Sequence, residues 1–178
     1  MLYIVIILLF SVYLYITIRD LRMLFQVTKL NRGTRTERKL ILFLLKYGID
    51  PHTIFHNLYL VNYKDNYSQI DVVAVTNAGI IVFEVKDYSG WIFGNGYNNY
   101  WTQTLAFGNR RYRFYNPIKQ NNKHIEVLKK QLQQFNDIPF YSVIIFYGDC
   151  SFRALSNIPD DTIIIKPNRL KYVLRSIS

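Results

Sequence analysis

The first eighteen residues contain no charged side chain, and this feature constrains the chain more than any other. The run from Leu2 to Phe10 is continuously apolar, residues 12–18 are nearly so, and Arg19 ends the segment. A helix needs about 17–20 apolar residues to cross the hydrocarbon core of a bilayer. We therefore predict a transmembrane anchor over residues 1–18. A cleaved signal peptide is the main alternative, although no basic residue precedes the run. A buried core helix is disfavoured because the segment has no polar stripe.

Basic residues follow this apolar run. They are Arg19, Arg22, Lys29, Arg32, Arg35, Arg38 and Lys39. The positive-inside rule places that side of the membrane in the cytoplasm. We expect a single-pass protein of the cell membrane, with residues 19–32 as a juxtamembrane connector and a cytoplasmic globular domain over residues 33–178. The formal net charge of +10 suits a polyanionic partner, either nucleic acid or an anionic membrane surface.

The rest of the chain shows the mixed pattern of an α/β domain. Thr34 and Glu37 have the spacing of a capping box, and Gly48 ends the helix that they begin. Strands are predicted at 53–62, 69–76, 80–86, 141–147 and 162–165, a loop at 89–99, and a hairpin from 100–106 and 110–115. Further helices are predicted at 117–135 and from about 168. This order predicts a mixed β-sheet flanked by helices.

Three charged residues on neighbouring predicted strands suggest a reactive site. Glu84 and Lys86 are two residues apart, so their side chains share one face of a strand. Asp71 lies near the start of the preceding strand, and a tight turn at 77–79 lets the two strands pair. Two carboxylates suit Mg²⁺, and a nearby lysine can orient or deprotonate water. The alternative is a structural salt bridge, which is costly inside an apolar strand unless it is well paired.

This ordered set of motifs resembles the nuclease-related (NERD) domain, which is placed with the restriction-endonuclease-like PD-(D/E)xK nucleases. The matching segments are residues 33–37, 69–73, 78–80, 83–86, 88–90, 101 and 116–120. The match covers roughly residues 30–150, and the ordered set is more specific than any one piece. The resemblance implies a restriction-endonuclease-like sheet and Mg²⁺- or Mn²⁺-dependent hydrolysis of phosphodiester bonds.

The resemblance also implies residue roles. Asp71 and Glu84 look like metal ligands, the Val85 carbonyl is a third candidate ligand, and Lys86 looks like the catalytic lysine. The proline that often precedes the first acid is replaced by Ile70, as is usual in this family.

Two further residues resemble supporting members of such a site. Glu37 resembles the family's helix acid, which can hold the metal or its water, but it could simply cap its helix. Gln120 resembles the polar residue on the helix behind the site, but it could equally solvate the first helical turn. His124 lies one turn further on and is expected to be a surface or helix-pairing residue. Trp91 and Trp101 are expected to be core or loop anchors rather than base-stacking residues.

A basic, aromatic segment provides candidate nucleic-acid contacts. Arg111 and Arg113 would share one face of a strand, and Lys119 and Lys123 follow on the next helix. A solvated strand face is the alternative. The leading hypothesis is a membrane-anchored, metal-dependent nuclease of DNA or RNA. Its rivals are a non-catalytic module that binds nucleic acid or protein at the membrane, and a structural membrane protein.

Overall fold

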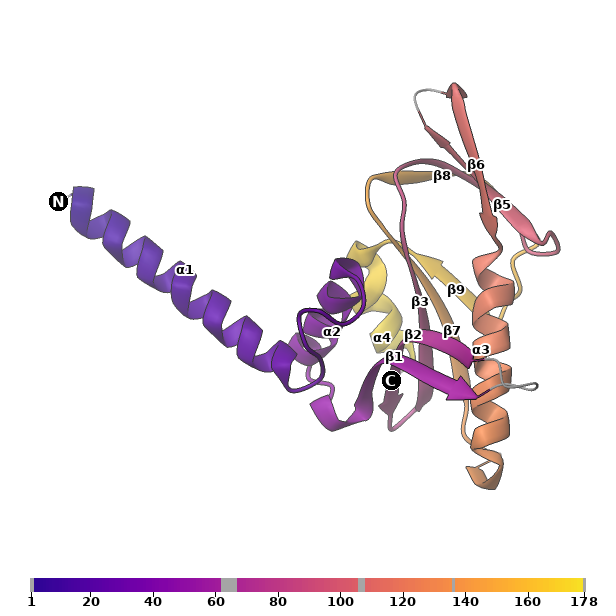
Figure 1. The fold of residues 1–178 in the computed structure, drawn as a ribbon, viewed down its shortest axis with the longest axis horizontal. Helices are drawn as coiled ribbons and strands as arrows, with labels where there is room; N and C mark the ends of the chain where they lie inside the picture. The colour runs from indigo at the N-terminus through magenta and orange to yellow at the C-terminus, as the bar shows by residue number, and fades with distance from the viewer. Residues whose placement is uncertain (1, 62–66, 106–107, 136, 178) are drawn as a thin grey trace.

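The first β-sheet of the globular domain has five strands in the order β1-β2-β3-β7-β9 (Figure 1). The computed structural model describes residues 2–61, 67–105, 108–135 and 137–177. The strands are β1 Ile54–Val61, β2 Tyr67–Thr76, β3 Gly79–Asp87, β7 Phe140–Tyr147 and β9 Thr162–Ile165. The first three are antiparallel, and β3, β7 and β9 are parallel. The central pair, β3 and β7, is the most completely buried, as expected for strands covered on both faces.

Helices cover both faces of this sheet. Helices α2, Arg35–Tyr47, and α4, Leu170–Ile177, lie on one side, and α3, Pro117–Gln131, lies on the other (Figure 1). The larger core is formed by Leu40, Leu44 and Leu170 from the helices with Val72 and Phe83 from the sheet. The predicted sheet flanked by helices is therefore confirmed. The predicted strand ends at 62 and 106 lie outside the described residues.

A second sheet packs against the amino-terminal end of α3, in the order β6-β5-β4-β8 (Figure 1). Its strands are β4 Gly90–Asn95, β5 Tyr100–Leu105, β6 Arg110–Tyr115 and β8 Cys150–Ser156. One face is buried against Phe146 and Ile118. Trp101 stacks on Phe146 with ring centroids 6.3 Å apart, which confirms Trp101 as a core anchor.

The prediction of a loop over residues 89–99 is wrong for its first half, which is β4. Its glycines and asparagines are typical of turns, but β4 pairs with β5 on one side and with β8 on the other. Gly94 is needed there for a different reason: an added Cβ would lie 2.3 Å from the Trp101 ring. Strand β8 was not predicted, because its pattern is recognisable only once β4 is beside it.

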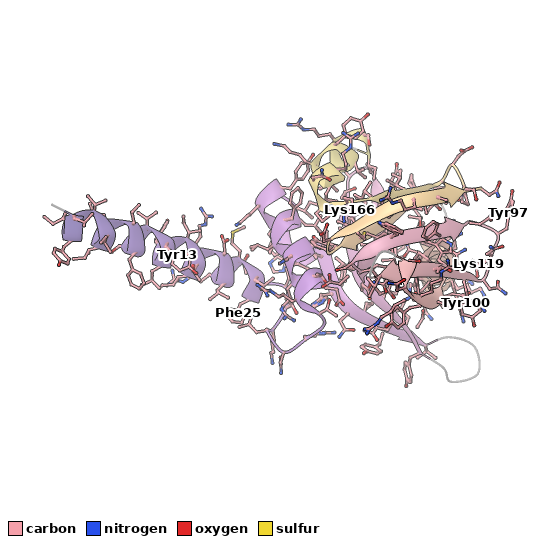
Figure 2. The ribbon with its side chains drawn as sticks, turned by 90° about the horizontal axis from the view of Figure 1, so that it is seen from above. Tyr13, Phe25, Tyr97, Tyr100, Lys119 and Lys166 are labelled. Carbon is pink, nitrogen blue, oxygen red and sulfur yellow. The ribbon has the colours of Figure 1, made fainter. Side chains whose placement is uncertain are left out.

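Helix α1 runs without a break over Leu2–Phe25, seven residues beyond the predicted end of the anchor. Its most apolar 18-residue window has a mean hydropathy of 2.2, and none of that window is buried. The alternative of a buried core helix is therefore wrong. The helix is long and apolar enough to cross a membrane, although a signal sequence has the same properties. Only its end contacts the body, through buried Leu24 and an ion pair between Asp20 and Lys46 of α2 (Figures 1 and 2).

Candidate active site

The side chains of strand β2 stop alternating regularly between the two faces of the sheet at Asp71. Ile70 and Val73 pack on the α3 side of the sheet, whereas Val72 packs on the α2 side. On the neighbouring strand Asn57 has a φ of 52°, and the regular pairing of β1 with β2 skips both Asn57 and Asp71. Irregularities of this kind re-aim side chains and are frequent next to active sites.

The Asp71 carboxylate lies where β2 and β3 stop pairing. The last regular pair is Val72 with Phe83, and Asp71 Oδ2 accepts a hydrogen bond of 2.8 Å from the backbone N–H of Val85. Burial and, next in size, the negative charge of Glu84 together raise the pKa of Asp71 to about 7, although the hydrogen bond from the Val85 N–H acts to lower it. Asp71 is therefore held close to its protonation midpoint at neutral pH.

Glu84 and Lys86 face α3, as their spacing predicts. The Glu84 side chain is buried, and its Oε1 lies 2.6 Å from Lys86 Nζ. Lys86 Nζ also donates a hydrogen bond of 3.0 Å to Gln120 Oε1 on the first turn of α3. The structure thus brings Glu84, Lys86 and Gln120 into direct contact.

His124, which was predicted to be a surface or helix-pairing residue, also belongs to this group. His124 is buried; its Nε2 lies 3.4 Å from Glu84 Oε2 and its Nδ1 lies 2.7 Å from Ser68 Oγ. Glu84 Oε2 and His124 Nε2 have no hydrogen-bond partner among the described residues. The signal for His124 was its position one helical turn after Gln120, which places both side chains on one face of α3.

Glu37 is buried on α2 and belongs to a separate set of hydrogen bonds. Its Oε1 accepts a bond of 2.7 Å from Thr34 Oγ1, and its Oε2 lies 2.9 Å from His56 Nε2. His56 Nδ1 in turn lies 2.6 Å from Thr28 Oγ1. Burial raises the pKa of Glu37, but the hydrogen bonds from His56 and Thr34 outweigh it, so the net shift is downward. Thr34 and Glu37 do form the cap of α2, where Thr34 Oγ1 accepts a hydrogen bond from the Glu37 N–H. The role of Glu37 as a metal ligand stays a prediction.

A divalent cation fits Asp71 and Glu84 by the chemistry of the donors. Within the described part of the chain no three His, Cys, Asp or Glu side chains converge into a complete metal site. Mg²⁺, however, commonly uses only one or two carboxylates and keeps several waters. Glu84 Oε2 lacks a hydrogen bond, and the Asp71 pKa is raised partly by the charge of Glu84. Both observations indicate negative charge that a cation would compensate.

The candidate nucleic-acid residues lie on β6 and α3. Arg111 and Arg113 are exposed on the same face of β6, as predicted. Lys119 Nζ donates to Asn99 Oδ1 at 2.7 Å, and Lys123 is exposed one turn later. Lys119 and Tyr100 lie at the end of the body that is remote from α1 (Figure 2).

Residues 32–147 match the family model of the nuclease-related domain, NERD. The chain belongs to the nuclease-related domain family. The matched segment contains all five candidate catalytic residues, which are Glu37, Asp71, Glu84, Lys86 and Gln120. Helix α1, strands β8 and β9, and helix α4 lie outside it.

An uncharacterized protein of Bacillus anthracis is 28% identical to this NERD chain over 125 residues. The alignment covers 70% of this chain and 57% of the relative, so the chain spans little more than half of the relative's length. No solved structure matches the chain. Family membership therefore rests on the NERD match.

Proposed function

We propose that this NERD protein is a membrane-anchored, metal-dependent nuclease that hydrolyses phosphodiester bonds of DNA or RNA. One observation supports this most directly. Asp71 and Glu84 are close enough for the charge of Glu84 to raise the Asp71 pKa, and Lys86 contacts Glu84 at the same place. Burying such charges on a central, apolar strand costs free energy, so their presence there suggests that they take part in binding or catalysis.

Asp71, Glu84 and the Val85 carbonyl would hold Mg²⁺ or Mn²⁺. When bound, such an ion polarises a phosphoryl oxygen and activates water. The Asp71 carboxyl must lose its proton to serve as a ligand, and its pKa of about 7 allows this near neutral pH. Glu37 remains a proposed ligand of the metal or of its water, a role that requires its carboxylate to turn away from Thr34 or His56.

Lys86 is proposed as the catalytic lysine. Contacts with Glu84 Oε1 and Gln120 Oε1 fix its ammonium group on the α3 side of β3. From this position it can orient the attacking water and stabilise the negative charge that develops on the phosphoryl group. Gln120 is proposed to set the direction of the lysine.

Binding of the nucleic-acid backbone is proposed for Arg111, Arg113, Lys119 and Lys123. The net charge of +10 supports a polyanionic substrate. Helix α1 is proposed as the single-pass anchor, with the basic residues after it on the cytoplasmic side.

The test uses the full chain in phosphatidylcholine nanodiscs with labelled DNA and RNA, in Mg²⁺, Mn²⁺ or EDTA. The parent protein is expected to produce cleavage products only with metal, and Lys86→Ala is expected to produce none. Lys171→Ala, which removes an exposed lysine of α4, is the matched control and should cleave like the parent. Equal cleavage by Lys86→Ala and the parent would reject the assigned site.

A non-catalytic binding module is the second candidate. The supporting observation is that Lys86 is engaged by Glu84 and Gln120, as in a structural ion pair. This function predicts nucleic-acid binding with a steep salt dependence but no product in either metal.

A further inference from the structure

The second sheet has one buried face and one open face. Because alternate residues of a strand share a face, the pairing of β4, β5 and β6 places two rows side by side on the open face. One row consists of Trp91, Thr104 and Arg111, and the other of Phe93, Thr102 and Arg113. A hollow of about 290 Å³ lies among them, lined by Trp91, Phe93, Thr102, Thr104, Gly108 and Arg111.

Every charged residue on the strands of this sheet is basic. Strands β4, β5, β6 and β8 contain four arginines, Arg110, Arg111, Arg113 and Arg153, and no aspartate or glutamate. Among the described residues, none of these arginines forms an ion pair with a carboxylate. A surface with one sign of charge attracts a polyanion.

Two of the arginines lie over aromatic rings. The Arg113 guanidinium is 4.8 Å from the centre of the Tyr100 ring, and that of Arg153 is 4.7 Å from Trp91. Tyr100 is 50% exposed, and Tyr115 meets it edge to face. A guanidinium that stacks on a ring keeps the N–H donors along its edge available for phosphate. Each pair therefore combines a flat stacking surface with a cation.

We propose that this arginine–aromatic face, made of Trp91, Tyr100, Arg111, Arg113 and Arg153, binds single-stranded nucleic acid as the substrate of the proposed active site. Unpaired bases can stack on exposed rings and on guanidinium planes, whereas the bases of a duplex are already stacked on one another. That the bound strand is a substrate rests on the proposed nuclease function, whereas the binding itself does not.

The face lies close to the catalytic cluster along the chain. Gly90, the first residue of β4, follows Lys86 by four residues, so their Cα atoms are at most ~14 Å apart. Strand β3, which carries Lys86, thus leads almost directly into β4 of the second sheet. An anionic membrane fits less well, because α1 leaves the body beside α2, across the first sheet from α3 (Figure 1).

The experiment measures binding in EDTA, so cleavage plays no part in it. Full-length protein in phosphatidylcholine nanodiscs is titrated into fluorescein-labelled oligothymidylate, oligouridylate and a duplex of the same length. The triple variant R111Q/R113Q/R153Q is expected to bind the single strands at least tenfold more weakly. Three lost phosphate contacts should reduce the slope of log K against log salt by about 2.

Two further variants separate stacking from charge. Tyr100→Leu keeps the charge and is expected to weaken single-strand binding by about fivefold or more, with little effect on the duplex. Arg169→Gln is the matched control, because Arg169 also lies over an aromatic ring, Tyr172, but near α4. It should bind like the parent.

Two results would overturn the inference: unchanged oligothymidylate binding by the triple variant, or duplex binding by the parent as tight as single-strand binding. If the triple variant keeps its oligonucleotide affinity but no longer cosediments with phosphatidylglycerol vesicles, the face binds an anionic membrane instead. If the parent never cleaves but the triple variant loses binding, the nuclease proposal fails and the arginine–aromatic face stands.

Discussion

The Nε2 atom of His124 lies 3.4 Å from the Oε2 atom of Glu84, inside the core between α3 and β3. Ser68 Oγ holds the other ring nitrogen of His124 at 2.7 Å. Glu84 is thus bordered by Lys86 on one oxygen and by His124 on the other.

Replacing His124 should therefore destabilise the folded chain. His124→Phe leaves Ser68 Oγ buried without its hydrogen-bond partner and removes the imidazole beside Glu84 Oε2, so it should lower the free energy of unfolding by about 1–3 kcal/mol. His124→Gln retains a hydrogen-bonding group and should lose less. Urea unfolding of the full chain in nanodiscs measures both, and equal stability of His124→Phe and the parent would contradict the role.

The pKa of Asp71 predicts how stability depends on pH without added metal. The folded pKa of about 7 lies above the ordinary value of 3.8, so the folded chain binds more protons between these values and stability falls as pH rises through this window. Asp71→Asn keeps an acceptor for the Val85 N–H. At about pH 8 it should be more stable than the parent by ~1–2 kcal/mol. This is less than the free energy that the whole pKa shift would correspond to, because Asp71 is only half-buried and solvent screens its charge.

The comparison is made by urea unfolding at several pH values in EDTA. The difference between Asp71→Asn and the parent should shrink toward about pH 4, where the Asp71 carboxyl is protonated in the folded chain. A constant difference across the range would refute the raised pKa.

Divalent cations should stabilise the parent. At about one hundred times the dissociation constant, Mg²⁺ or Mn²⁺ should add about 2.7 kcal/mol to the free energy of unfolding. The effect should be weaker below about pH 7, because protons compete for Asp71. Asp71→Asn and Glu84→Gln should lose the shift in melting temperature, while the exposed control Glu126→Gln should keep it.

Glu37 should show the opposite pH dependence. Its pKa is lowered below the ordinary 4.5, so its stabilising contribution is present above that value and is lost as pH falls through the folded pKa. Glu37→Gln should be less stable at neutral pH by ~1–2 kcal/mol. In acid the two proteins should converge. Thermal melts across pH measure this, and a deficit that persists in acid would argue against the lowered pKa.

Much of the fold follows from local patterns. Helix α2 begins after Thr34 and reaches its left-handed cap at Gly48, as predicted. The two-residue spacing of Glu84 and Lys86 put both side chains on one face of β3, and Lys86 met Gln120, which the family motif had singled out. Family membership likewise followed from the order of short motifs.

The sequence alone determined the apolar helix, most strands and the shared face of Glu84 and Lys86, because caps, alternation and turns depend on residues a few positions apart. Only the tertiary structure decided the rest. Pairing with β8 made a strand of the glycine-rich β4, contact with His56 occupied Glu37 Oε2, and burial brought His124 to Glu84. These contacts join residues distant in sequence, and no local pattern specifies them.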